Sequence, residues 1–531
     1  MIRPTRSWAA LAALSAAILI VAPLIGWPRV VRLPAVLVPA LALGLLAARP
    51  WAWTDRDREA IAQWMPSSRA VWYGALAATA LLGWIVLTRF LSGSINAVDF
   101  TVYFDRPLYQ TAHGRPLFVE TADQPSFSYR SQLAVHAHYL LFAVAPLYRL
   151  AATPCWLLAL SVVAVTAGGV HTLRIVQRLS GSGLVAVAAA LAFVLNANTA
   201  RTLMFGFHPE VLYAWLLPAA LDAALSGKRL PFVAAVVACA CVKEDAFMPL
   251  FAMSVALALT GTVPRRSRWL FFALPTTIGL ANLLLYYYWI LPAFGSSVPA
   301  YAPLWGNYGP TPAKAAWGMV TNPGRVARDV LASGFWRLLL PHGLLSLAGW
   351  RWIIGTLPIV VLYSASANDQ VQAFGLYYSI VLVPFLAIGA AMGALALARA
   401  LFTRESSAII AAAVAVLMAS LVFYADRAGY SLRRWRADVL STRDVMASIS
   451  ADRVVLVQSA IYPHAGYEPR VILLTRQTLS DPRYRDAAIV LAPGLDAYPF
   501  APGELEALAR QPGAIRTPGG LVIAQAIARQ R

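Results

Sequence analysis

The sequence predicts an α-helical polytopic membrane protein of about 11–13 transmembrane helices, followed by a small α/β domain outside the membrane. Three observations support this fold class. Of the 531 residues, 59% are hydrophobic and only 13% are charged, whereas a soluble protein carries about 25% charged residues. The mean hydropathy is +0.63. Apolar runs reach the length of a membrane-spanning helix, about 20 residues, whereas barrel strands have only about 9–11. This composition excludes soluble, disordered and fibrous proteins.

The net charge of +19 comes almost entirely from arginine, because only Lys228, Lys243 and Lys314 of the 43 basic residues are lysines. Membrane proteins concentrate basic residues in cytoplasmic loops. A nucleic-acid partner is not expected, since binding would need a basic patch on a soluble module and none is apparent. The three cysteines form neither a disulfide framework nor a zinc pattern.

Apolar runs mark thirteen candidate spans along the chain. The expected ranges are 8–27, 33–48, 71–91, 155–176, 183–200, 211–226, 230–242, 246–262, 269–291, 334–350, 352–364, 376–400 and 408–424. Several are short, so some are expected to pair as broken or re-entrant helices.

Basic residues indicate the orientation, because they are retained in the cytoplasm. Arg3 and Arg6 place the N-terminus in the cytoplasm, and the arginine-rich stretch 49–69 is the first cytoplasmic loop. The stretch 92–154 is then outside. Its apolar end, 133–150, is interrupted by histidine, proline and arginine, and we interpret it as an interfacial helix. Counting it as a span would move three later basic clusters outside. The predicted location is the cytoplasmic (inner) membrane, with the C-terminus outside.

Three regions follow from this pattern. Residues 1–70 hold two N-terminal transmembrane helices and a cytoplasmic loop, 71–428 form the main transmembrane domain with first outer loop 92–154, and 429–531 form the small extracytoplasmic domain. Within that last region, β-branched runs predict strands at 453–457, 471–475, 488–491 and 521–524, and helices are expected at 441–449 and 502–510.

Only four acidic residues occur between positions 125 and 328: Glu210, Asp222, Glu244 and Asp245. An ionised group at the centre of a membrane helix costs about 2.5–3.5 kcal/mol on insertion scales, so each one needs a reason. For Asp222 we expect an ion pair with neighbouring Lys228 and Arg229. The other three lie at the outer ends of spans, on the same face as the first outer loop.

That loop adds Asp99 and Asp105, which a helical spacing of six places on roughly opposite sides. It also adds Arg115, His136 and His138. Each of these residues alone could have a purely structural role, because the ends of membrane helices are exposed to water. Lys243 would pair with Glu244 or Asp245, and His208 would cap a helix that begins at Pro209. Together they predict an acid/base site with cations for a phosphate.

An ordered set of motifs resembles a known family. The set comprises Val98-Asp-Phe-Thr-Val-Tyr-Phe-Asp105, Gly114-Arg-Pro-Leu-Phe118, His136-Ala-His138 with Ala145-Pro-Leu-Tyr-Arg149, Phe205-Gly-Phe-His-Pro-Glu210, Val242-Lys-Glu-Asp245 and Gly375-Leu-Tyr-Tyr378. Over about residues 85–400 the chain resembles the multi-pass membrane proteins catalogued as domain of unknown function 2079, a family that is similar to the GT-C class of membrane glycosyltransferases. The chain departs from the family pattern at Gly206, where an acidic residue is common, and in its two extra N-terminal spans.

This resemblance implies transfer of a sugar from a polyprenyl-phosphate donor to a cell-envelope acceptor at the outer leaflet. Asp99 would be the general base or orient the acceptor, with Asp105 as second choice. From its own position, Glu210 is a third candidate catalytic residue. The phosphate would be held by Lys243 first, or by Arg115 or Arg201. The remaining substrate-binding candidates are His136, His138, His208, Glu244 and Asp245. Whether Asp99, Glu210 and Asp245 instead bind Mg²⁺ or Mn²⁺ is open at this point.

Two other functions compete with this one. A transporter or lipid flippase would use ionisable residues and helices broken at Pro209 or Pro249 to line a path, but no inverted repeat is found and the acids lie at one face. A non-catalytic assembly or sensing protein would need far fewer spans for an anchor. The transferase interpretation requires Asp99, Glu210 and Lys243 to come together at the outer face.

Overall fold

The computed structural model describes residues 54–119, 131–263, 268–294, 301–426 and 430–525. The two expected N-terminal spans, 8–27 and 33–48, lie outside the described residues. The described part begins with α3 (Asp55–Ala62), whose first turn is capped by Thr54 in a reciprocal hydrogen-bonded box with Asp57.

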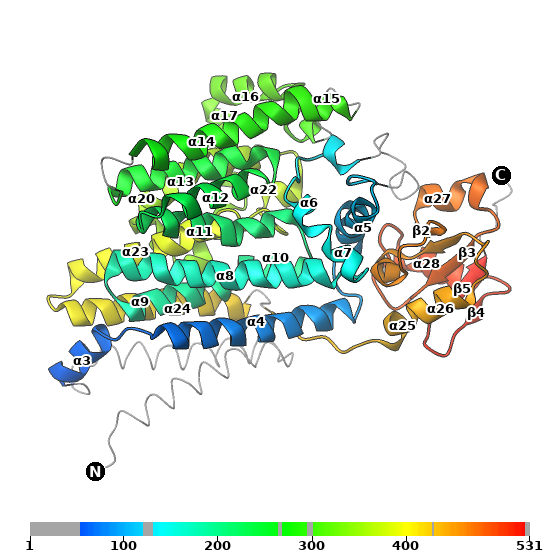
Figure 1. Ribbon diagram of the computed structural model, residues 1–531, viewed down its shortest axis with the longest axis horizontal. Helices are drawn as coiled ribbons and strands as arrows, with labels where there is room; N and C mark the ends of the chain where they lie inside the picture. Colours follow the sequence, from blue (N-terminus) through cyan, green and yellow to red (C-terminus); the bar gives the residue numbers. More distant parts are fainter. Residues whose placement is uncertain (1–53, 120–130, 264–267, 295–300, 427–429, 526–531) are drawn as a thin grey trace, which may run out of the picture.

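Long apolar helices run side by side through the larger part of the molecule (Figure 1). Five segments are long and apolar enough to cross a membrane: Ser68–Phe90, Cys155–Ser180, Gly183–Phe205, Trp269–Ala293 and Val383–Leu401. The helical membrane class is therefore confirmed. All eleven ranges expected between 71 and 424 contain helix, but several helices have only 12–14 residues, about 18–21 Å at 1.5 Å per residue. These include α11 (Tyr213–Leu225), α12 (Arg229–Ala240) and α13 (Phe247–Thr260).

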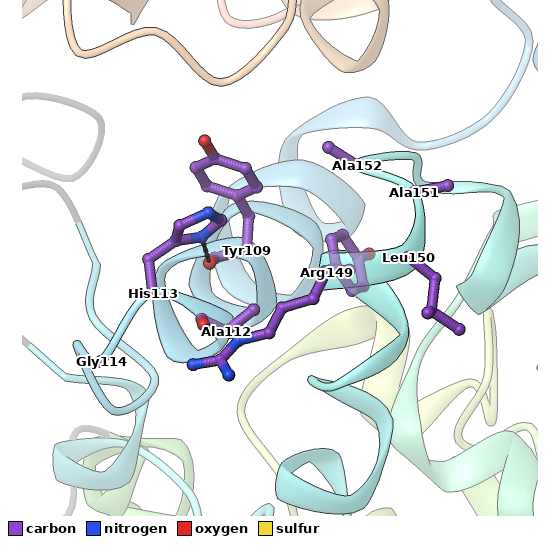
Figure 2. Close-up of a pocket in the computed structure, with 9 residues that line it drawn as sticks. Tyr109, Ala112, His113, Gly114, Arg149, Leu150, Ala151 and Ala152 are labelled. Carbon is purple, nitrogen blue, oxygen red and sulfur yellow. Dashed lines mark hydrogen bonds between the residues drawn. The ribbon is translucent and has the colours of Figure 1, made fainter.

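The first loop after α4 (Ser68–Phe90) contains no long helix among its described residues. It begins with a π-helical segment, η1 (Asp99–Asp105), which continues as α5 (Arg106–Ala112). After η2 (Gln132–Ala134), the expected interfacial stretch consists of two four-residue helices, α6 (Leu141–Val144) and α7 (Leu147–Leu150). The end of α5 and the end of α7 lie beside each other (Figure 2).

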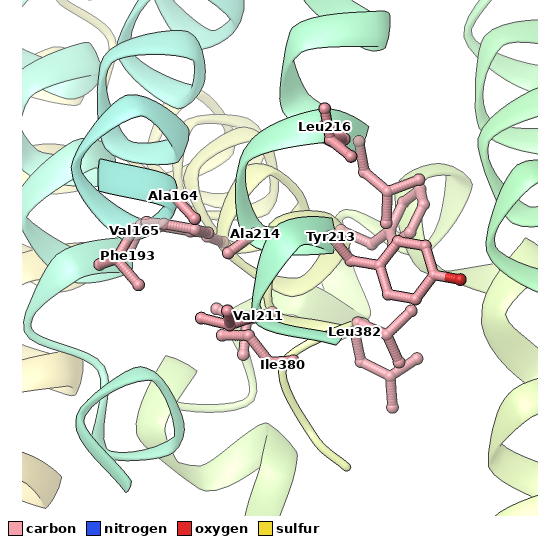
Figure 3. Close-up of a cluster of buried hydrophobic side chains, with 14 of the residues drawn as sticks. Ala164, Val165, Phe193, Val211, Tyr213, Ala214, Leu216, Ile380 and Leu382 are labelled. Atoms are coloured by element: carbon pink, nitrogen blue, oxygen red, sulfur yellow. The ribbon is translucent and has the colours of Figure 1, made fainter. Parts of the chain in front are cut away.

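The transmembrane core is built from small and branched side chains. Ala164 and Val165 of α8 (Cys155–Ser180) face Phe193 of α9 (Gly183–Val194) and Ala214 of α11 (Figure 3). A Cβ placed on Gly168 of α8 would lie 2.0 Å from the carbonyl oxygen of Ala214, so only glycine permits this approach of α8 to α11.

The remaining helical segments of the described transmembrane region are mostly short. They are α10 (Ala197–Phe205), η3 (Pro209–Leu212), η4 (Glu244–Ala246), α14 (Arg268–Leu285), η6 (Tyr286–Ile290), α15 (Leu291–Ala293), η7 (Ala302–Trp305), α16 (Pro312–Thr321), α17 (Pro323–Ala332), α18 (Phe335–Leu339), η8 (Leu340–His342), α19 (Leu345–Ala348), α20 (Trp350–Ile353), η9 (Ile354–Thr356), α21 (Leu357–Ser364), α22 (Asp369–Gln372), α23 (Val383–Leu401) and α24 (Glu405–Asp426).

Asp222 on α11 pairs with residues of α8, not with its sequence neighbours. Its carboxylate accepts hydrogen bonds from Arg178 and from His171 Nδ1, the latter over 2.9 Å, and Arg174 lies 3.9 Å away. The expected pairing with Lys228 and Arg229 is therefore wrong, because close packing of α11 on α8 turns the carboxylate toward that helix.

The C-terminal part folds around a five-stranded sheet with strand order β2-β1-β3-β5-β4. Strands β1, β2 and β3 are parallel, and β5 runs antiparallel between β3 and β4. The bounds are α25 (Ala437–Leu440), α26 (Thr442–Ser448), β1 (Val455–Val457), η10 (Ser459–His464), β2 (Val471–Leu473), α27 (Arg476–Ser480), η11 (Pro482–Tyr484), β3 (Ala488–Leu491), α28 (Pro502–Ala509), β4 (Ile515–Arg516) and β5 (Val522–Gln525).

One face of this sheet packs against the first loop. Val455 and Val457 face a buried cluster that includes Val102 of η1 and Val119, while Leu456 between them faces a separate cluster on the other side. Arg106 of α5 donates hydrogen bonds to three carbonyl oxygens of the C-terminal part, including that of Val471 at 3.0 Å. The sheet is thus docked on the segment that carries Asp99 and Asp105.

Candidate functional site

The site is centred on Glu210, which lies in η3 just after the chain reverses at Gly206. Gly206 has φ +124° and ψ −147°, a conformation open essentially only to glycine. The carboxylate of Glu210 is 3% exposed and accepts hydrogen bonds from His208 Nδ1 and, over 2.9 Å, from Lys243 Nζ. Burial raises the pKa of Glu210, but its interactions with His208 and with the charged Lys243 outweigh this and hold it well below its usual range.

Lys243 is shared between two carboxylates. Besides its bond to Glu210, its Nζ lies 3.6 Å from Asp245 Oδ2. Burial lowers the pKa of Lys243, yet the neighbouring charges of Asp245, Glu210 and Glu244 raise it overall, so the ammonium stays charged. Burial raises the pKa of Asp245 to about 6, against the opposing effect of Lys243. Asp245 is therefore the carboxyl of this group that gains a proton most easily.

Glu244 faces the first loop. Its Oε1 lies 2.8 Å from His136 Nδ1, and its Oε2 accepts the Ala137 N–H over 2.9 Å. Burial raises the pKa of Glu244, but His136 and this N–H lower it to about 2. The imidazole of His136 also stacks on Tyr301, with ring centroids 5.0 Å apart. Two segments about a hundred residues apart in sequence are joined here by one buried carboxylate.

His138 lies between these two groups. Its ring centroid is 5.1 Å from that of His136 and 6.3 Å from that of His208, and the side chain is 1% exposed. Neither of its ring nitrogens has a hydrogen-bond partner among the residues that the structure describes. Burial, followed by the charge of His136, lowers its pKa well below the usual value, so the ring is neutral. A buried neutral imidazole in this position can still donate one hydrogen bond and accept another.

Asp99 lies at the edge of the same group. It is half-buried at the start of η1, and its backbone N–H donates to Asn96 Oδ1 over 3.3 Å. Burial raises the pKa of its carboxyl, and the charge of nearby His208 opposes the rise. His208, which bonds Glu210, is thus within electrostatic range of Asp99.

Asp105 points into a different environment. It is 1% exposed, and its Oδ1 accepts hydrogen bonds from the hydroxyls of Tyr148 and Tyr467, each over 2.8 Å. Burial raises its pKa to about 7, although both hydroxyls and Arg106 act to lower it. The expectation that Asp99 and Asp105 face different ways agrees with these contacts, and Asp99 is the less buried of the two.

The other two predicted cations are Arg115 of the first loop and Arg201 of α10. Arg115 is exposed, lies 3.4 Å over the ring of Phe118 and donates to Gln110 Oε1. Arg201 is half-buried on α10, nine residues before Glu210 in the sequence. For a metal, no group of three or more His, Cys, Asp or Glu side chains within the described ranges is arranged to hold an ion. The carboxylates of Glu210 and Glu244 have Lys243 and His136 as partners instead.

Every residue of this network lies within a single family match. The sequence matches the family described as Predicted membrane protein (DUF2079) over residues 94–488. The chain belongs to this family. The match extends past the expected end near residue 400, takes in β1 and β2, and ends at Ala488, the first residue of β3, so the DUF2079 region includes part of the C-terminal sheet.

Comparison with other proteins adds the following. No curated protein matches this DUF2079 protein. Similar solved structures are ArnT from Cupriavidus metallidurans in the apo state (13% identity, TM-score 0.46) and the same protein bound to undecaprenyl phosphate (12% identity, TM-score 0.47). Each alignment covers 87% of this chain and 99% of the ArnT chain. At 12–13% identity, these similarities do not establish an activity for this protein, which is argued below from its own residues.

Several aromatic residues of the DUF2079 site were not predicted. Tyr377 stacks on His208 with ring centroids 3.4 Å apart, and Tyr301 stacks on His136. The motif Gly375-Leu-Tyr-Tyr378 was a usable signal for Tyr377, because it belongs to the same ordered set as Glu210. No sequence signal links Tyr467 to Asp105, since the two are 362 positions apart.

Proposed function

We propose that this protein is a membrane glycosyltransferase, which moves a sugar from a polyprenyl-phosphate donor to a cell-envelope acceptor at the outer leaflet. The observation that carries the proposal is the convergence of three distant segments at one end of the helical bundle. Asp99 lies within electrostatic range of His208, His208 bonds Glu210, and Glu210 pairs with Lys243. These relationships support a site that combines the half-buried carboxylate of Asp99 with a buried, charged network.

Asp99 is the proposed general base. Its half-buried carboxylate has a raised pKa, which makes it a stronger base than an ordinary aspartate. It would take the proton of an acceptor hydroxyl as that oxygen bonds to the anomeric carbon of the sugar. The bond from this carbon to the phosphate oxygen then breaks, and polyprenyl phosphate leaves with the electron pair. Asp105 has no catalytic part in this proposal, because its carboxylate is occupied by two tyrosines.

The buried network would hold the phosphate and orient the sugar. Lys243 is the first candidate for the cation that faces the leaving phosphate, because protonation of Asp245 would free part of its charge. Arg115 and Arg201 are further candidates. His138, whose nitrogens have no partner in the described part of the chain, would bond sugar hydroxyls, and His136, His208 and Glu244 would fix its surroundings. No metal ion is needed for this scheme.

The proposed orientation places the N-terminus in the cytoplasm and the C-terminal domain outside the inner membrane. We retain the division into residues 1–70, 71–428 and 429–531 as part of this proposal. A membrane location follows from the family and the five candidate spans. The partners would be membrane lipids, the lipid-linked sugar donor and the envelope acceptor.

The test compares envelope glycans and lipid-linked sugars by mass spectrometry. The strains are a deletion, the deletion with wild type restored, and the deletion with Asp99→Asn or Asp369→Asn at equal protein level. Asp369 is the matched control, because it is an exposed aspartate at the start of α22. We expect deletion to remove one sugar and accumulate its lipid-linked precursor. Wild type and Asp369→Asn should reverse this, and Asp99→Asn should not.

Two other outcomes would change the assignment. Full restoration by Asp99→Asn would remove Asp99 from the site. An unchanged glycan profile on deletion, in cells that normally make the protein, would reject the transferase proposal and favour a transporter or lipid flippase.

A further inference from the structure

A cavity with several polar lining residues lies outside the network around Glu210. It has a volume of about 640 Å³ and is formed by the end of α5, by α7 and by the residues that follow α7 (Figure 2). Its polar lining comes from Tyr109, His113, Tyr148 and Arg149. None of its lining residues is acidic, and none belongs to the group of Glu210, Lys243 and Asp245.

Arg149 is held in place at this cavity by its own Nε, which donates to the carbonyl oxygen of Ala112 over 2.7 Å. This bond caps the C-terminal end of α5 and fixes the plane of the guanidinium. The residue is exposed, and its two terminal nitrogens form the free end of the side chain in Figure 2. A fixed guanidinium with two open nitrogens matches the paired oxygens of a phosphate.

His113 is oriented in a similar way. Its Nδ1 lies 2.7 Å from the carbonyl oxygen of Tyr109, which can only accept, so Nδ1 carries the proton and Nε2 is left for another partner. The ring packs on Tyr109 with centroids 4.3 Å apart, and Tyr109 stacks in turn on Tyr467 of the C-terminal domain at 4.3 Å. The cavity is therefore coupled by stacked rings to that domain.

The position of the cavity relative to the membrane follows from α8. This helix is a candidate span, and it begins at Cys155, three residues after the cavity lining ends at Ala152. Trp156, in its first turn, donates from Nε1 to the carbonyl oxygen of Ala151 over 3.0 Å, and tryptophan is enriched where membrane meets water. Leu150 is 76% exposed beside it. The cavity thus lies just before the start of a candidate span, with an exposed apolar side chain in its lining.

We propose that this cavity binds the phosphate headgroup of an anionic phospholipid, from the leaflet on the side of the C-terminal domain. Arg149 forms the charge-assisted bonds to the phosphate, His113 Nε2 forms a further bond, and Leu150 contacts the acyl chain. The lipid would connect α5 and α7 and, through Tyr109 and Tyr467, the docked sheet. This inference does not depend on the proposed sugar transfer.

The test measures lipid binding to the purified full-length protein by native mass spectrometry. Phosphatidylglycerol is titrated against phosphatidylcholine, with inorganic phosphate as a soluble competitor. The variants are Arg149→Gln and Ala152→Trp, of which the second fills the cavity without touching Arg149 or His113. Arg325→Gln is the matched control, because Arg325 is also exposed and donates to a carbonyl oxygen, that of Asn307, over 2.9 Å.

We expect phosphatidylglycerol to bind in preference to phosphatidylcholine, and each cavity variant to weaken this binding about tenfold, equivalent to about 1.4 kcal/mol. Arg325→Gln should bind like wild type. Equal binding of the two lipids, or wild-type binding by Ala152→Trp, would overturn the proposal. Displacement by millimolar inorganic phosphate would make the site one for free phosphate and exclude the lipid. Should Arg149→Gln misfold, as judged by circular dichroism, Ala152→Trp alone decides.

Discussion

Lys243 donates a hydrogen bond to Glu210 over 2.9 Å at a place where both side chains are buried. The pair joins the turn after α10 to the turn before α13, two segments that the chain separates by a complete helical hairpin. Removing one member of a buried ion pair leaves an unbalanced charge, which costs more than removing both.

Lys243→Met is therefore expected to destabilise the protein by about 3–5 kcal/mol. Glu210→Gln should also destabilise it, because Lys243 is then left with Asp245 alone. The double variant Glu210→Gln/Lys243→Met should cost clearly less than the sum of the two. Thermal unfolding of the full-length protein in detergent micelles measures all three. Additive losses would show that the two charges do not stabilise each other.

The pH–activity profile of the proposed sugar transfer should fall on its acidic side because of Asp99. Burial raises the pKa of its carboxyl above the usual 3.8, and only the deprotonated form can accept a proton. Activity should therefore fall as pH drops through this raised pKa, and be fully present above it. Sugar transfer in membranes that contain the protein and its native donor, followed between pH 4 and 8, measures this fall. Asp369→Asn should keep the wild-type profile, and a profile flat down to pH 4 would contradict the assignment of the base.

Asp105 should make stability fall as pH rises. Its pKa is raised from 3.8 to about 7 in the folded protein, so between these values the native state holds more protons than the unfolded one. The stabilisation is fully present below about pH 4 and is lost through pH 7, with a slope of at most about 1.4 kcal/mol per pH unit. Asp105→Asn should abolish this dependence. Comparing melting temperatures of the two proteins across this range tests the prediction, and parallel curves would contradict it.

Gly206 should resist substitution although a Cβ there would make only ordinary van der Waals contacts. A Cβ there would meet nothing closer than 3.8 Å, so the obstacle is the backbone conformation at φ +124°. Gly206→Ala is expected to cost about 1–3 kcal/mol. Gly181→Ala, at φ +69° in a milder left-handed conformation, is the control and should cost less. The midpoints of thermal unfolding compare them, and equal losses would contradict the special role of position 206.

The helices and most strands of this chain were predictable from periodic patterns in the sequence, but the contacts between distant side chains were not. Strands β1, β2, β3 and β5 follow β-branched runs, whereas the two exposed residues of β4 (Ile515–Arg516) leave no pattern to detect. The acids at span ends stood out because charge is rare there. Their partners did not: nothing in the local sequence indicates that Glu244 bonds His136, or that Asp222 turns to α8. Such contacts depend on how helices pack, which single-sequence periodicity does not encode.

The cluster that joins Val102 and Val119 to the C-terminal sheet also bears on how the protein is made. The first loop is synthesised more than three hundred residues before the strands that cover it. The apolar side chains of this loop are therefore uncovered until the strands have been synthesised. The sheet then packs its hydrophobic side chains against a loop that is already in place. A fragment that starts at residue 430 would lack that surface and expose the matching apolar face, which favours aggregation. Structural and binding work on the C-terminal domain thus requires the whole chain, or a fusion that supplies residues 98–119.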